Sequence, residues 1–227
     1  MLREKCGSGI FITNEIHDII SLMFADDVAS CAETAIKLQQ QLNVIDEFCA
    51  LTGMEINLQK TEIIVFRNGG PLRHYEHWNF RGTQINTTSI YKYMGLMFTP
   101  KLSWNASHEK LSAQAQKAIF AIYNYKKSFG YFPIKELFIL FDSMIKPILC
   151  YGSQIWGYEY IDSIEVVHNK FCKRILCVKK STNTCLVHGE CWRLPLCVTY
   201  FVNFINYLCK LLIICLIIDT LNNAIKC

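Results

Sequence analysis

The sequence has no internal repeat and no low-complexity tract. Residues 1–11 contain no apolar h-region, which predicts an intracellular protein, cytoplasmic or nuclear, that is not secreted. We therefore expect its 12 cysteines to be reduced and packed as small hydrophobes rather than joined in a disulfide framework. Disorder is excluded because 52% of the residues are apolar, so folding can bury enough surface to offset the chain entropy.

The formal net charge is only +4, but acidic and basic residues are unevenly distributed. Through Glu62, ten acidic residues stand against four Lys or Arg, whereas 92–180 contains thirteen basic residues against six acids. This asymmetry indicates either a catalytic or metal-binding region joined to a polyanion-binding region, or an ordinary solvated surface. Charge alone favours the solvated surface.

The apolar pattern predicts strands first and helices later, which is typical of the α+β class. Short apolar runs on either side of Asp26-Asp27 predict a β-hairpin. A helix is expected between an N-cap at Thr34 and a stop at Gly53. Further strands are predicted at 9–12, 54–57, 61–66, 78–80, 84–86 and 91–98.

After Pro100 the pattern is helical almost to the end of the chain. Helices are predicted over 104–125 and 134–145, with a break near Pro147. Another helix is expected to begin with a capping box formed by Asp162 and Glu165. These helices should form a second, helical part of the protein.

The candidate catalytic motif is Phe24-Ala25-Asp26-Asp27, which lies between the two strands of the predicted hairpin. Nucleotidyl transfer uses metal ions that bridge the phosphates and activate the attacking hydroxyl. Magnesium typically takes one or two carboxylates as ligands, and acids at an exposed turn can supply them. An Asp-Asp dipeptide by itself is also typical of an ordinary acidic turn.

Further segments follow this motif, and together they carry a resemblance to a known family. They are Gly53–Glu62, Tyr91–Leu96, Lys146–Gly157, Phe171–Leu176 and Gly189–Leu196. With the Phe-Ala-Asp-Asp motif they resemble, in order and spacing, the reverse transcriptases of non-LTR (LINE-type) retrotransposons. The matching features are the catalytic turn, the next palm motif, the Tyr-Leu-Gly hairpin that grips the primer, and a Tyr-Gly-x-x-x-Trp segment beyond the thumb. The resemblance covers roughly residues 9 to 210.

The resemblance implies catalytic roles for three residues. Asp26 would be a ligand of the catalytic metal, Mg²⁺ or Mn²⁺, and Asp27 its less directly liganded neighbour. Lys60 would act as general acid toward the leaving pyrophosphate, which a positioned lysine can do. The residues alone favour a surface lysine at the end of a loop.

The resemblance also implies an RNA/DNA template–primer duplex as partner. Tyr93, Met94 and Gly95 would position the primer end, although a plain β-turn fits the same residues. The basic helices would hold the duplex by its phosphates, without sequence preference and with strong salt dependence. The residues expected to bind nucleic acid are Tyr93, Met94, Gly95, Lys117, Lys126 and Lys127.

By this resemblance the chain divides into three parts. Residues 1–100 would be the C-terminal half of the palm, an antiparallel sheet with a packed helix and the primer-grip-like hairpin. Residues 101–157 would be a helical thumb, and 158–227 a helical extension with an apolar tail. The family's other metal-binding aspartate lies on an earlier palm strand, so we expect the isolated chain to be inactive. The missing N-terminal part of the polymerase is an expected partner, and a non-catalytic nucleic-acid-binding remnant is the alternative.

Two other features of the sequence each allow more than one interpretation. Cys185, His188, Cys191 and Cys197 have the right ligand types for zinc, but the resemblance places Cys191 at an apolar position, which favours packed core cysteines. The tail at 198–218 is long enough to cross a bilayer, although polar residues interrupt it. A buried or partner-facing helix is favoured over a membrane segment, which would make the chain a membrane-attached product.

Overall fold

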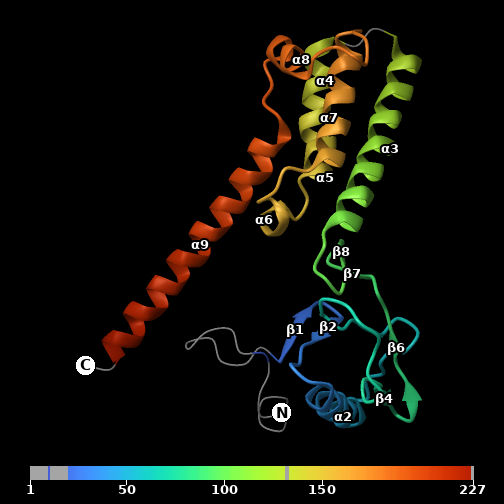
Figure 1. Ribbon diagram of the computed structural model, residues 1–227, viewed down its shortest axis with the longest axis vertical. Helices are drawn as coiled ribbons and strands as arrows, with labels where there is room; N and C mark the ends of the chain where they lie inside the picture. The colour runs from blue at the N-terminus through green and yellow to red at the C-terminus, as the bar shows by residue number, and fades with distance from the viewer. Residues whose placement is uncertain (1–9, 11–19, 131–132, 226–227) are drawn as a thin grey trace. The chain divides into compact units, whose positions relative to one another are not determined.

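The structure is a computed structural model that describes residue 10, residues 20–130 and residues 133–225, without the side chains of 126–129 and 215–225 (Figure 1). Most of the strand predicted at 9–12 lies outside the described residues. Two compact units are present. The first is Met1–Tyr91 with Thr99–Leu102, and the second is Lys92–Phe98 with Ser103–Cys227. The α+β class is confirmed, whereas the predicted boundaries at residues 100 and 157 stay a prediction.

The strands of the first unit pair two by two instead of forming one sheet. They are β1 (Ser21–Phe24), β2 (Asp27–Ser30), β3 (Glu62–Ile63), β4 (Asn79–Phe80), β5 (Thr83–Gln84) and β6 (Asn86–Thr87). The pairs β1–β2 and β4–β5 are antiparallel, while β3–β6 is parallel. The strand predicted at 54–57 is wrong. That segment is irregular and mostly exposed, so it has no buried face to pair and pack.

Helix α2 (Ala35–Thr52) of the first unit begins and ends as its sequence predicts. The Thr34 side chain accepts a hydrogen bond from the Lys37 amide, and Gly53 ends the helix in the left-handed conformation with φ of 69°. The helix packs on a small core around the buried Trp78 and Leu42. The Trp78 indole donates to the Ala35 carbonyl at 3.0 Å, which fixes the start of α2 against this core.

The second unit contains a hairpin and a group of helices. Its elements are β7 (Tyr91–Tyr93), β8 (Leu96–Phe98), α3 (Asn105–Phe129), α4 (Ile134–Leu140), η1 (Phe141–Ile145), α5 (Lys146–Leu149), α6 (Ser153–Trp156), α7 (Asp162–Ile175), α8 (Thr184–Cys191) and α9 (Leu196–Ile225). Helix α3 lies along η1, α5 and α7 (Figure 1). Their shared core is built around the fully buried Phe141, Phe171 and Trp156.

Two helix-end predictions are wrong. The chain does not break near Pro147, because the π-helix η1 widens the turn ahead of it and α5 continues through the proline. Pro147 lies in the first turn of α5, where a helix tolerates proline. Asp162 and Glu165 do not form a capping box, since Ile161 is the N-cap and makes no side-chain cap bond. The Glu165 carboxylate binds elsewhere.

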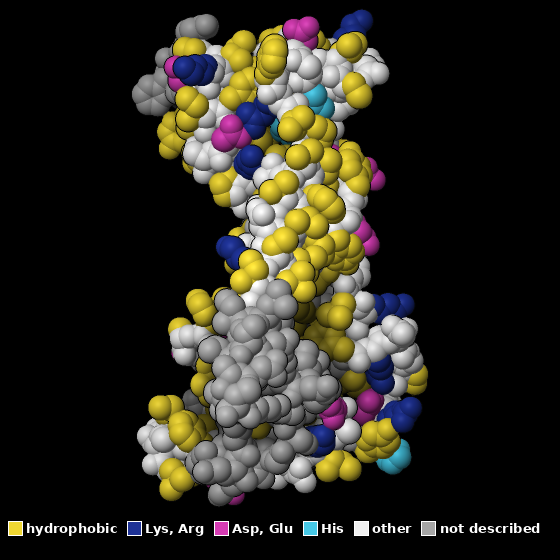
Figure 2. Space-filling model, turned by 90° about the vertical axis from the view of Figure 1, so that its left-hand side faces the viewer, with side chains coloured by type: hydrophobic (Ala, Val, Ile, Leu, Met, Phe, Trp, Pro, Cys, Tyr) yellow, Lys and Arg dark blue, Asp and Glu magenta, His cyan; other side chains and the backbone are white. Residues whose placement is uncertain are grey.

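Helix α9 is packed only along its beginning. Leu196 and Tyr200 are buried, and the Asn203 amide donates to the Ser153 hydroxyl of α6 at 2.9 Å. Phe204 then packs against Tyr158 with ring centroids 5.6 Å apart. Beyond Phe204 the described apolar side chains of α9 are exposed, and Figure 2 shows them gathered along the helix. The segment Leu196–Ile214 is long and apolar enough to cross a membrane by length and composition, and only 6% of that window is buried. Whether a partner or a bilayer covers it stays a prediction.

Candidate functional site

The Asp-Asp motif lies at the tip of a β-hairpin that has a two-residue turn. Strands β1 and β2 pair with Phe24 opposite Asp27, so that Ala25 and Asp26 form the turn. Ala25 has a φ of 52°, which is uncommon for a residue other than glycine. Both aspartates are exposed. The predicted hairpin is therefore confirmed, and it presents Asp26 at its tip.

The base of this hairpin is tied to α2 by Gln41, which was not among the predicted site residues. Gln41 is buried, with 1% of its surface exposed. Its side chain accepts a hydrogen bond from the Ser30 hydroxyl at 2.6 Å and donates to the Cys31 carbonyl at 2.9 Å. Gln41 stands three residues after Leu38 and four before Ile45, so a polar residue on the apolar face of α2 was the available signal.

Lys60 lies in an exposed turn that follows Asn57, whose carbonyl accepts from the Lys60 amide at 3.1 Å. Among the described residues, no hydrogen bond or ion pair joins Lys60 to Asp26 or Asp27. In the part of the chain that the structure describes, no three His, Cys, Asp or Glu side chains are grouped to hold a metal ion. The two carboxylates have the donor type that Mg²⁺ prefers, but a full ligand set would need further groups.

The primer-grip-like segment is a tight hairpin. Met94 and Gly95 form its two-residue turn with φ of 48° and 86°, and two positive φ values match a type I′ turn. Tyr93 leads into this turn at the end of β7 and packs edge-on against Phe98 with ring centroids 6.4 Å apart. The segment predicted to grip the primer thus forms one tight hairpin in the structure.

This hairpin packs on the Tyr-Gly-x-x-x-Trp segment, which lies more than fifty residues later. The Tyr151 hydroxyl donates to the Met94 carbonyl at 2.7 Å. A Cβ atom on Gly95 would lie 2.9 Å from the Tyr151 ring, and one on Gly152 would lie 2.8 Å from the Leu96 side chain. Each segment therefore has a glycine where a side chain of the other comes close. The sequence indicated both segments but not their contact.

The basic residues expected to bind nucleic acid lie on α3. Lys117 is exposed on this helix. Lys126 and Lys127 belong to its last turns, and their side chains lie outside the described residues. These lysines and the primer-grip-like hairpin belong to the second unit, whereas Asp26, Asp27 and Lys60 belong to the first.

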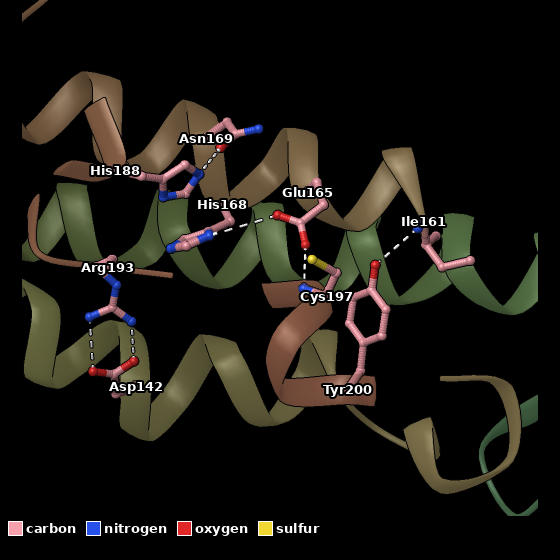
Figure 3. Close-up of polar contacts among 9 residues, drawn as sticks. All are labelled: Asp142, Ile161, Glu165, His168, Asn169, His188, Arg193, Cys197 and Tyr200. Atoms are coloured by element: carbon pink, nitrogen blue, oxygen red, sulfur yellow. Dashed lines mark hydrogen bonds and ion pairs between the residues drawn. The ribbon is translucent and has the colours of Figure 1, made fainter. Parts of the chain in front are cut away.

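A buried polar cluster joins α7, α8 and α9 (Figure 3). The Glu165 carboxylate accepts from the Cys197 amide at 2.5 Å, in the first turn of α9, and lies 4.0 Å from His168 Nδ1. His188 Nε2 lies 2.8 Å from the Asn169 side-chain oxygen. Burial raises the pKa of Glu165 and lowers the pKa of His168 to about 3. Glu165 therefore caps α9, while His168 is held neutral.

The clearest ion pair of the second unit joins Arg193 to Asp142 through both guanidinium nitrogens and both carboxylate oxygens. The guanidinium also lies over the Phe138 and Phe141 rings, at 4.9 and 5.2 Å from their centroids. Arg193 thereby ties the chain after α8 to η1. Arg193, the basic residue of the Gly189–Leu196 segment, thus has a structural role that the sequence did not predict.

The four residues weighed for zinc are spread over α8 and α9. Cys185 is exposed, His188 is buried, and Cys191 and Cys197 are partly buried. His188 is bound to Asn169, and the Cys191 thiol interacts with the buried Cys172 thiol of α7. None of these side chains belongs to a group of three potential ligands among the described residues.

Comparison with known proteins gives one informative match. The chain is 25% identical over 166 residues to an uncharacterized transposon-derived protein of Caenorhabditis elegans. A transposon-related origin follows. The match covers 70% of this chain and 57% of the relative, so the chain spans just over half the length of that protein. No family model and no solved structure matches the sequence.

Proposed function

We propose that this chain is a reverse-transcriptase-derived part of a non-LTR transposable element that binds an RNA/DNA template–primer duplex. The contact between the Tyr91–Leu96 hairpin and the Tyr151-Gly152 segment carries the proposal. Two distant segments that the resemblance selected in the sequence pack on each other through Met94 and Tyr151. The transposon-derived relative supports the same origin.

In this proposal the exposed Asp26 supplies a carboxylate to a metal ion that assists phosphoryl transfer. Asp26 lies in the turn and Asp27 begins β2, so we expect Asp26 rather than Asp27 to face a given ion. A two-metal site needs at least one further carboxylate. We therefore propose that the chain alone binds duplex without extending a primer, and that the remaining ligands come from another part of the polymerase.

Primer extension on an RNA template tests the catalytic side of this proposal. The purified chain would be assayed in Mg²⁺ and then in Mn²⁺, beside Asp26→Ala and Asp27→Ala, with Asp46→Ala as control. We expect no extension by any of them, together with salt-dependent duplex binding that Asp26→Ala leaves intact. Extension that both Asp26→Ala and Asp27→Ala abolish would overturn the inactivity and require an acid supplied in trans. Absence of both binding and extension would rule out the proposed function.

A further inference from the structure

The end of α7 carries an uncompensated positive charge. Five cations lie within eleven residues: Lys170, Lys173, Arg174, Lys179 and Lys180. No acidic residue occurs between 169 and 189. All five except Lys173 are exposed. We call these five side chains the α7 basic patch.

The fold holds several of these charges in place. Helix α7 ends with Cys177 in the left-handed conformation (φ 55°), and the Val178 amide donates back to the Lys173 carbonyl at 3.1 Å. The Lys173 ammonium in turn donates to the Lys180 carbonyl at 2.8 Å. The segment that carries Lys179 and Lys180 is therefore folded back onto the helix, and its charges gather beside those of α7.

Arg174 is oriented by α3. Its guanidinium carbon lies 3.8 Å from the centroid of the Tyr123 ring, a close cation–π contact. Figure 1 shows α3 and α7 ending at the same end of the helical group. The backbone of Lys126 and Lys127 therefore lies toward the same end as the α7 basic patch.

In the described part of the chain, no carboxylate forms an ion pair with any member of the patch. Other cations are paired, such as Arg193 with Asp142 and Arg67 with Glu76. Cations gathered without counter-charge repel one another, and a polyanion relieves that repulsion. A nucleic acid backbone presents closely spaced phosphates and releases its condensed counterions on binding.

We propose that the α7 basic patch binds the phosphate backbone of nucleic acid, as a contact surface separate from the hairpin and from Lys117. This inference rests on the proposed function and adds to it a named site. Because the contacts go to phosphate, the patch supplies affinity and position without sequence preference.

The test compares Lys179→Gln/Lys180→Gln with a control of equal charge loss, Lys37→Gln/Lys101→Gln. The full chain is titrated with a fluorescent RNA/DNA duplex, and anisotropy is followed at several salt concentrations. The slope of log affinity against log salt should become shallower by about 2 in the patch variant, about one unit for each lost phosphate contact. The control should keep the slope of the unsubstituted chain.

The outcomes separate this inference from the proposed function. Duplex binding by the unsubstituted chain with an equal slope in the patch variant, or an equal loss in the control, would overturn the inference and leave the proposed function standing. No duplex binding by the unsubstituted chain would overturn both. Vesicles of phosphatidylserine form a second arm. Vesicle binding that needs Lys179 and Lys180, with duplex binding unchanged, would assign the patch to a membrane surface and overturn the inference.

Discussion

The Tyr151 hydroxyl donates a 2.7 Å hydrogen bond to the Met94 carbonyl and so joins the tip of the β7–β8 hairpin to the start of α6. The hairpin is held from its other side by Ser107 of α3, whose hydroxyl accepts from the Met97 amide at 2.7 Å and donates to the Met97 carbonyl at 3.0 Å. The two-residue turn is therefore fixed both at its tip and through its second strand.

Replacing Gly95 with alanine should destabilise the second unit. Alanine at a φ of 86° is strained, and its Cβ would lie 2.9 Å from the Tyr151 ring and displace it. The strain costs about 1–2 kcal/mol, and losing the bond to Met94 adds roughly 1 kcal/mol. Urea denaturation followed by circular dichroism measures the loss of unfolding free energy.

Gly130→Ala is the matched control for this prediction. Gly130 has a φ of 83°, but nothing lies within 4 Å of the position its Cβ would take. It should lose only the energy of the strained backbone. Equal destabilisation of the two variants would mean that the contact with Tyr151 does not hold the hairpin.

Arg193→Lys should destabilise the protein although it conserves the charge. Lysine cannot form the two-pronged pair with Asp142, and it loses the planar contact with the Phe138 and Phe141 rings. We expect a loss of about 1–2 kcal/mol in the unfolding free energy, measured by urea denaturation. In the control, Arg81→Lys, the pair with Asp46 is exposed, so no measurable loss is expected. A stability of Arg193→Lys equal to that of the unsubstituted chain would contradict the structural role of this pair.

Local signals in the sequence predicted the local structure well. The caps of α2, the turn at Gly95 and the hairpin at Asp26 depend on residues close in the sequence, whose backbone preferences act directly. The long α3 followed from its apolar period. The π-helix η1 before Pro147 was not predictable, because a proline in the sequence indicates a helix break and says nothing of the preceding turn.

Contacts between distant segments were not predictable from single residues. Glu165 looked like half of a capping box, yet its carboxylate caps α9, thirty-two residues later. The burial of Gln41 and the pairing of Arg193 likewise depend on which elements meet in the fold. The same limit applies to the candidate site: its motifs were visible in the sequence, but the contact of Tyr151 with Met94 required the structure.

The exposed apolar side chains of α9 should lower the solubility of the isolated chain. Ile205 and Leu212 are 40% and 64% exposed, within a surface of neighbouring apolar residues. Ile205→Gln/Leu212→Gln should raise the soluble fraction after centrifugation. The control is Ile36→Gln/Leu51→Gln, whose side chains are even more exposed. It should raise the soluble fraction less, because Ile36 and Leu51 stand at opposite ends of α2 and do not share one surface. Equal solubility of both variants would show that α9 is not the aggregating surface.

The buried histidines should make the second unit sensitive to acid. Burial lowers the pKa of His108 to about 4 and that of His168 to about 3, whereas unfolded histidine titrates near 6.5. Below that pH the unfolded chain binds protons that the folded chain does not, so stability falls as the pH drops from about 6.5 toward these lower values. Each histidine should cost on the order of 2 kcal/mol by pH 5.

The nearby Glu165 acts in the opposite direction. Burial raises its pKa, so the folded chain keeps this proton to a higher pH than the unfolded chain, and its contribution to stability falls as the pH rises. Urea midpoints of His108→Gln and His168→Gln at pH 7.5 and pH 5, beside the exposed His74→Gln, separate these effects. The first two variants should lose less stability on acidification than the unsubstituted chain, and His74→Gln should follow the unsubstituted chain. An unchanged acid sensitivity in both buried variants would mean that these histidines are protonated in the folded protein.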